Sequence, residues 1–82
     1  MVKIHPHAKE RMYERGVEEK EVVETVKNGE SFIAKFNRKG FRRNFIFEGL
    51  WRDKSFNVKQ VEVITVEEND DIIVVTVIAK YF

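Results

Sequence analysis

Cysteine is absent from the 82-residue chain, and so is any long apolar run. The chain can form neither a disulfide nor a thiolate metal site, which fits the reducing cytoplasm, where we expect it. The longest apolar stretch, residues 72–79, contains Thr76 and is much shorter than the roughly 20 residues that span a bilayer. No long apolar segment follows Lys3, so neither a secretory signal nor membrane association is predicted.

Internal repeats and low-complexity segments are also missing. At 43% hydrophobic and 35% charged residues, the composition is that of a globular protein rather than a disordered one. The length predicts a single small domain over residues 1–82. The abundance of Lys and Glu is typical of heat-adapted proteins, in which surface ion-pair networks contribute to stability.

The net charge of +1 hides an uneven distribution along the chain. Residues 1–34 carry a net charge of −1, residues 35–59 carry +6, and residues 60–82 carry −4. A basic segment creates a local field that attracts acidic partners even when the total charge is near zero. The middle of the chain is therefore expected to meet RNA or an acidic protein, unless its cations only form a solvated surface.

Two helices are predicted in the N-terminal third. The first runs over residues 6–15, because Pro6 suits a first helical turn and Gly16 suits the left-handed residue that closes a last turn. The second runs over residues 18–27, where valines recur on one side before an Asn-Gly stop signal. So few residues separate them that a tight helical corner is expected.

The sequence then changes from a helical period to the two-residue period of β-strands. Four strands are predicted, at residues 32–36, 41–47, 56–67 and 72–79. A turn is expected over 37–40 and a loop over 48–55, and a bulge near Lys59-Gln60 accounts for a change of phase. The last strand is nearly all apolar, which predicts burial on both faces. The expected fold class is α+β, with two N-terminal helices packed on a four-stranded antiparallel sheet.

Seven apolar residues are expected in the core between helices and sheet. They are Val22, Val26, Phe45, Phe47, Val63, Val74 and Ile78. Arg43 interrupts the apolar side of the second predicted strand, so that end of the strand is expected beyond the core.

One row on the first predicted helix has the composition of a catalytic site. His7, Arg11 and Arg15 stand four residues apart and share a stripe of the helix. An imidazole moves protons near neutral pH, and a guanidinium matches a phosphate. In metal-independent RNA cleavage, His7 would transfer a proton while Arg11 and Arg43 hold the phosphate. As an alternative, His7 caps or pads the first turn and Arg11 pairs with a glutamate.

The two histidines, His5 and His7, are too few for a metal site. No cysteine and no clear third ligand accompany them, so neither a metal nor another cofactor is predicted.

Basic residues gather around the predicted turn and again on the following loop. The expected RNA contacts are Arg15, Lys39, Arg42, Trp51 and Arg52. Cations beside an aromatic ring are typical of surfaces that bind single-stranded nucleic acid. Two alternatives stay open: Trp51 anchors its loop by partial burial, and the cations meet an acidic protein.

A His-Ala pair at residues 7–8, an Arg-Met pair at 11–12 and an Arg-Gly pair at 15–16 precede an acidic helix that ends in Asn-Gly. This order resembles the opening of a small prokaryotic family of unknown function. The wider relatives of that family resemble the RelE and BrnT-like toxins, metal-independent ribonucleases that pair with an antitoxin. The resemblance implies a toxin-like α+β fold, RNA as substrate and an antitoxin as partner.

Position by position, the resemblance implies roles for His7, Arg11 and Arg15 on the first helix. It also implies a role for Arg42 or Arg43 at a strand start. The last strand of the family often ends in a Thr-x-Tyr pattern, which is replaced here by Thr-Val-Ile at residues 76–78.

Tyr81 is the nearest substitute for the missing tyrosine. It stands five residues after Thr76, and an odd offset places two residues of a regular strand on opposite faces.

The leading hypothesis is a toxin-like RNA-binding protein of a toxin–antitoxin module, with metal-independent endoribonuclease activity as a further expectation. The alternatives are a non-catalytic interaction module whose basic surface binds an acidic protein, and an uncharacterised structural domain. An enzyme needs His7 and at least two arginines around one concavity, whereas a binding module needs only a continuous basic face.

Overall fold

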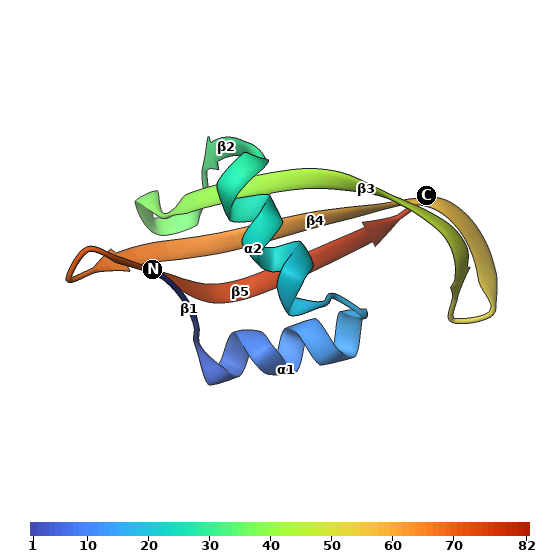
Figure 1. Ribbon diagram of the computed structural model, residues 1–82, viewed down its shortest axis with the longest axis horizontal. Helices are drawn as coiled ribbons and strands as arrows, with labels where there is room; N and C mark the ends of the chain where they lie inside the picture. Colours follow the sequence, from blue (N-terminus) through green and yellow to red (C-terminus); the bar gives the residue numbers. More distant parts are fainter.

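In a computed structural model, which describes residues 1–82, two helices lie on one face of a five-stranded sheet (Figure 1). The elements are β1 (Val2–Ile4), α1 (Pro6–Arg15), α2 (Glu19–Asn28), β2 (Glu30–Ile33), the 3₁₀ turn η1 (Lys35–Asn37), β3 (Lys39–Trp51), β4 (Lys54–Glu68) and β5 (Asp71–Tyr81). The α+β class and both predicted helices are confirmed. Neither helix is long and apolar enough to cross a membrane.

Helix α1 begins and ends where its sequence predicts. The Nδ1 atom of His5 accepts a hydrogen bond of 3.1 Å from the backbone N–H of His7, so His5 caps the first turn. Gly16 closes the helix in the left-handed region, with a φ of 68°. Ala8 and Met12 are the buried residues of the helix, which lies along β5.

Helix α2 starts with a capping box. The side chain of Glu21 accepts a hydrogen bond of 2.9 Å from the backbone N–H of Glu18, which satisfies a donor that the helix itself leaves free. Val22 and Val26 are buried where α2 crosses β3 and β4 (Figure 1). The two helices therefore meet at a corner over the sheet.

The strand order is β1-β5-β4-β3-β2, with β1 parallel to β5 and every other pair antiparallel. The prediction of four antiparallel strands is therefore wrong, because the sheet is mixed and has a fifth strand at one edge. A strand of three residues is too short to show a period in the sequence. The ammonium of Lys3 on β1 lies 2.9 Å from Asp71, and this hydrogen bond holds the pKa of the carboxyl below its usual 3.8.

The first hairpin differs from the prediction. Strand β2 ends at Ile33, and Phe36, expected in the strand, lies in η1 instead. Phe36 and Asn37 both adopt left-handed conformations, with φ of 61° and 58°. Such a conformation is rare for a bulky side chain. The alternation of apolar residues predicts a strand here and carries no sign of a left-handed turn.

The second hairpin is longer than predicted. Strands β3 and β4 continue through the expected loop to a two-residue turn, Arg52-Asp53, with φ of 51° and 66°. Two positive φ values in succession match the twist of paired strands. The register between β3 and β4 shifts between Ile46 and Gly49, and no shift occurs at Lys59-Gln60, so the predicted bulge position is wrong.

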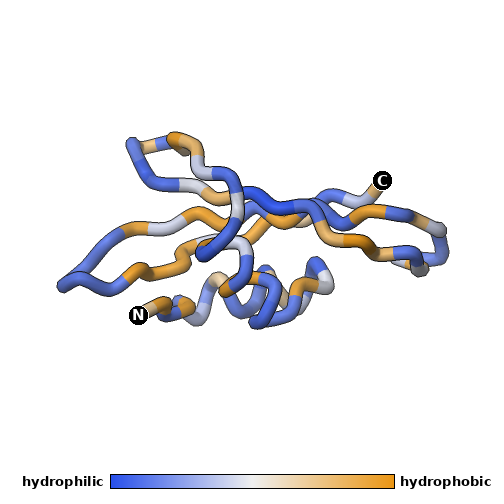
Figure 2. The backbone as a smooth tube through the Cα atoms, turned by 45° about the horizontal axis from the view of Figure 1, so that its top comes forward, coloured by the Kyte–Doolittle hydropathy of each residue, from blue (hydrophilic) through white to orange (hydrophobic).

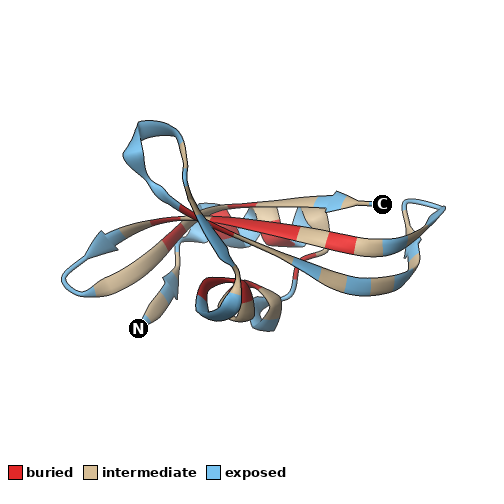
Figure 3. Ribbon diagram, turned by 90° about the horizontal axis from the view of Figure 1, so that it is seen from above, coloured by how far each residue is buried: buried red, intermediate tan, exposed pale blue.

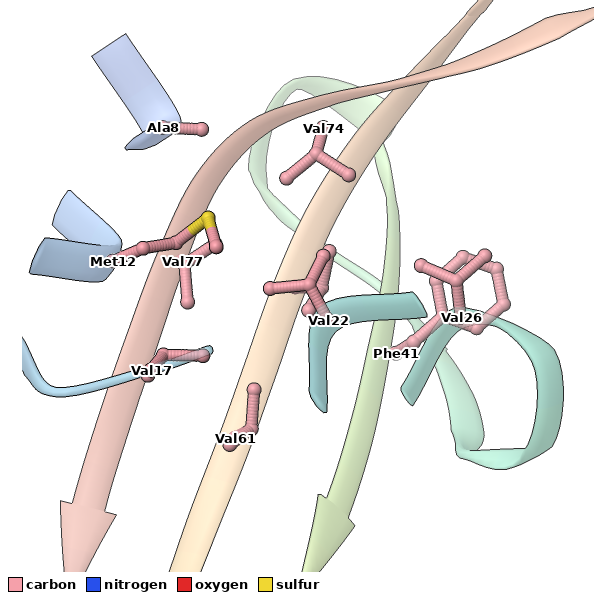
Figure 4. Close-up of a cluster of buried hydrophobic side chains, with 10 residues drawn as sticks. Ala8, Met12, Val17, Val22, Val26, Phe41, Val61, Val74 and Val77 are labelled. Atoms are coloured by element: carbon pink, nitrogen blue, oxygen red, sulfur yellow. The ribbon is translucent and has the colours of Figure 1, made fainter. Parts of the chain in front are cut away.

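The core lies between the helices and the middle of the sheet (Figures 3 and 4). Its buried residues are Ala8, Met12, Val17, Val22, Val26, Phe41, Val61, Val63, Val74 and Val77. The prediction is confirmed for its four valines. Phe45 and Phe47 are only half-buried. Ile78 lies on the face of β5 that points away from the core, and its neighbour Val77 takes the core position instead.

The sheet face opposite the helices is open, so β5 is not buried on both faces as predicted. Ile64, Thr76 and Ile78 alternate with core residues and reach this open face, where they are half-buried. Figure 2 shows that apolar residues recur along the strands, whereas the two helices consist mostly of polar residues. One layer of helices thus covers only one of the two faces of the sheet.

Candidate functional site

The three residues predicted for catalysis do not meet in one place. His7 is exposed at the start of α1, and Arg11 pairs with a glutamate of its own helix at 2.9 Å. Arg43 reaches the last turn of α2, where it donates to a backbone carbonyl at 3.3 Å and lies 3.6 Å from Glu24. A cation at the end of a helix is favoured by the helix dipole. No hollow of the surface is lined by His7 or Arg11.

Arg42 lies on the other face of β3 from Arg43 and is also paired. Its Nε atom lies 2.8 Å from a carboxylate oxygen of Glu62, and its guanidinium stacks 4.5 Å from the ring centroid of Phe32. The two arginines of the predicted basic strand start are therefore neutralised by acidic residues from outside the basic segment.

Three of the residues predicted to bind RNA do come together, at the corner between α1 and α2. Trp51 stacks on Tyr81, with 4.8 Å between ring centroids and 12° between ring planes. The guanidinium of Arg52 lies 5.3 Å from the Trp51 ring. The Tyr81 hydroxyl donates to the backbone carbonyl of Arg15 at 2.6 Å, and the Arg15 guanidinium donates to the carbonyl of Val77.

Lys59, on β4, is the next member of this group. Its side chain is 7% exposed, and its ammonium donates to the backbone carbonyl of Gly16 at 2.9 Å and to the carboxylate of Glu21 at 2.8 Å. The same ammonium lies 5.6 Å from the ring of Phe47. We name the following five residues the corner cluster: Arg15, Trp51, Arg52, Lys59 and Tyr81.

Most polar groups of the corner cluster are committed to holding the helices on the sheet. Burial raises the pKa of Tyr81 above its usual 10.0, the carboxylate of Glu21 raises it further, and Arg52 opposes both. The Tyr81 hydroxyl is therefore protonated near neutral pH and serves as a donor. Lys59 is held by two acceptors. Arg52 alone is exposed and forms no ion pair.

Five cations of the basic segment form no ion pair, and the fold separates them into two groups. Lys35, Arg38 and Lys39 lie at the η1 end, whereas Arg52 and Lys54 lie at the tip of the β3–β4 hairpin (Figure 1). The two tips are at opposite ends of a molecule 41 Å long. The predicted RNA contact Lys39 is therefore far from the corner cluster, and the chain has two basic tips rather than a continuous basic face.

The comparison with known families gives one match. A family model described as a domain of unknown function (DUF4258) matches residues 4–79. The chain belongs to the DUF4258 family. The expectation of a family of unknown function is thereby confirmed, and the match covers nearly the whole chain of this DUF4258 protein. No curated protein and no solved structure is significantly similar to the chain.

Lys59 is the member of the corner cluster that sequence analysis missed in this DUF4258 protein. It precedes Val61 and Val63 in strict alternation on the face of β4 that the helices cover. A lysine at a core position of a strand is the signal of a buried ion pair. The bulge predicted near Lys59-Gln60, as the reason for the change of phase, hid this alternation.

Proposed function

We propose that this DUF4258 protein is a toxin-like protein that binds single-stranded RNA at the corner cluster. The observation that supports the proposal is the position of Arg52, an exposed and unpaired guanidinium beside the half-exposed ring of Trp51. A free cation can contact a phosphate while the neighbouring ring stacks with a base. Lys54, two residues further on, is a second free cation at the same tip.

Binding, rather than cleavage, is the activity that the geometry supports best. His7 lies eight residues before Arg15 on α1, which is about 12 Å along the helix axis. A general acid or base must come within about 3 Å of the reacting oxygen, or act through one water. A phosphate held near the C-terminal end of α1 is thus out of reach of His7. Arg11 and Arg43 already pair with carboxylates.

Binding of a 12-nucleotide RNA should quench the fluorescence of Trp51, which is the only tryptophan of the chain. Arg52→Ala should weaken the affinity about tenfold, because a hydrogen bond to a charged group contributes about 1.5 kcal/mol. The same change should reduce the slope of log affinity against log salt by about 0.7, as expected for one lost phosphate contact. Titrations at several salt concentrations measure both effects.

Lys9→Ala is the matched control, because Lys9 is an exposed and unpaired cation of α1 outside the corner cluster. It should leave affinity and salt slope unchanged. Asp53→Asn, in the same turn as Arg52, should strengthen binding by removing a repelling charge. Equal losses for Arg52→Ala and Lys9→Ala would show that the RNA attraction is diffuse and would contradict binding at the corner cluster.

The His7→Ala variant should bind RNA as the wild type does, and neither protein should cut it in the presence of a chelator. Incubation with a labelled RNA, followed by separation of the products by size, checks this. If the wild type cuts RNA and His7→Ala lowers the rate about 10²–10⁴-fold, His7 transfers a proton and binding alone is the wrong function.

A further inference from the structure

A hollow of about 450 Å³ opens on the sheet face that no helix covers, at the η1 end of the molecule. Its eight lining residues are Phe32, Ala34, Lys35, Phe36, Arg38, Ile64, Thr76 and Ile78. The β2–β3 turn bends away from the helices and toward this open face (Figure 3). The hollow therefore lies between the η1 turn and strands β4 and β5. We name it the open-face hollow.

The residue at the mouth of the open-face hollow is both exposed and conformationally strained. Phe36 is 86% exposed and has a φ of 61°, a backbone conformation that a bulky side chain adopts only with strain. Exposure of a phenyl ring gives no hydrophobic gain that would offset this strain. Strain of this kind is concentrated at binding sites, where it positions a side chain for a ligand.

The charge of the open-face hollow has one sign. Lys35 and Arg38 lie on its lining, neither forms an ion pair, and no carboxylate lines the hollow. The guanidinium of Arg38 lies 5.6 Å from the Phe36 ring, so cation and aromatic ring share one edge. Apart from the hydroxyl of Thr76, the rest of the lining is apolar and offers a phosphate backbone no further cation.

We propose that the open-face hollow docks an acidic amphipathic peptide segment of a partner protein. The apolar side chains of the segment would fill the space between Phe36 and Ile78, and its carboxylates would pair with Lys35 and Arg38. An apolar floor with a rim of unpaired cations is complementary to such a segment and to neither RNA nor a neutral peptide. This interaction is independent of the corner cluster, which lies on the helix side at the other tip.

Selection from a displayed library of random 12-residue peptides tests the proposal with the full chain as bait. The enriched peptides should combine two or more aromatic or aliphatic residues with an excess of Asp and Glu. A synthetic copy of the most enriched peptide, labelled with a fluorophore, should bind the wild type saturably, and its affinity should fall as salt is added. Failure to enrich any peptide, or enrichment of basic peptides, would overturn the proposal.

Phe36→Asn removes the ring and keeps the fold, because Asn tolerates the left-handed conformation better than Phe. It should weaken the peptide at least tenfold, as loss of a central aromatic anchor does. Arg38→Glu should weaken it by a similar factor through charge repulsion. The matched control is Ile46→Asn, which removes an 84% exposed apolar side chain of β3 that does not line the hollow. It should change the affinity less than twofold.

Two further measurements separate this proposal from its rivals. Quenching of Trp51 by RNA should be the same in the wild type and in Phe36→Asn, so loss of RNA binding in that variant would assign the open-face hollow to RNA. Sedimentation should show that the wild type is a monomer. If the wild type self-associates and Phe36→Asn abolishes the association, a second copy of the chain is the occupant of the open-face hollow. Equal losses of peptide affinity in Phe36→Asn and Ile46→Asn would show non-specific adhesion.

Discussion

Lys59→Met should lower the free energy of unfolding by about 3 kcal/mol, the lower end of the range for removing one partner of a buried ion pair. The variant keeps the apolar stem of Lys59 but leaves the carboxylate of Glu21, whose side chain is 13% exposed, without its cation. It also leaves the carbonyl of Gly16 without the donor that lies 2.9 Å away. Urea unfolding of both proteins, followed by circular dichroism, measures the difference.

Lys80→Met is the control for a lysine on an exposed strand position. Its ammonium lies 3.9 Å from Glu62, and its side chain is 58% exposed, so solvent screens the pair and the loss should stay below about 1 kcal/mol. Adding Glu21→Gln to Lys59→Met should restore more than half of the loss. Gln can still accept in the capping box of α2, and the uncompensated charge is gone. An additive double variant would contradict the buried pair as the cause.

The helices of this fold were predictable because their signals are local. Pro6 starts a helix because it lacks the N–H that a first turn leaves unpaired. Gly16 and the Asn-Gly pair at the end of α2 stop a helix through their own backbone conformation. Neither effect depends on the rest of the chain. Strand β1 was not predictable, because three residues of it gain their hydrogen bonds only from a partner some 70 residues later. The two faces of β5 also look alike in the sequence, and only the side on which the helices pack decides which face stays open.

The candidate site was predictable in its residue types more than in its arrangement. Trp51 and Arg52 were identified from cations near an aromatic ring and Arg15 from the row on the first helix, and the three do meet at one corner. Arg42 and Arg43 carried the same signal, but β4 and α2 bring glutamates against them. Which side chains of β3 and β4 face each other depends on the register of the two strands. That register is set by the Arg52-Asp53 turn and by the shift between Ile46 and Gly49, and the hydropathy pattern revealed neither.

Gly16→Ala should lower the free energy of unfolding by about 2–4 kcal/mol, since two separate effects add. The φ of 68° at this position places an L-residue in the left-handed region. A Cβ atom there would also come within 2.5 Å of the Trp51 ring and 3.1 Å of the Tyr81 hydroxyl. The ring of Trp51 must move, and the stack on Tyr81 is disturbed with it. Thermal unfolding and the emission maximum of Trp51 report the two consequences.

Gly49→Ala is the matched control, on the hairpin that carries Trp51. Its φ is outside the left-handed region, and the nearest contacts of an added Cβ would be ordinary ones, at 3.5–3.6 Å from Phe47. The stability should change by less than about 0.5 kcal/mol. Because Gly16 supports the ring beside which Arg52 stands, Gly16→Ala should also weaken RNA binding, whereas Gly49→Ala should not. If Gly16→Ala unfolds the protein more easily yet binds RNA with unchanged affinity, the Trp51 ring is only an anchor of the hairpin, and the stacking role proposed for it is wrong.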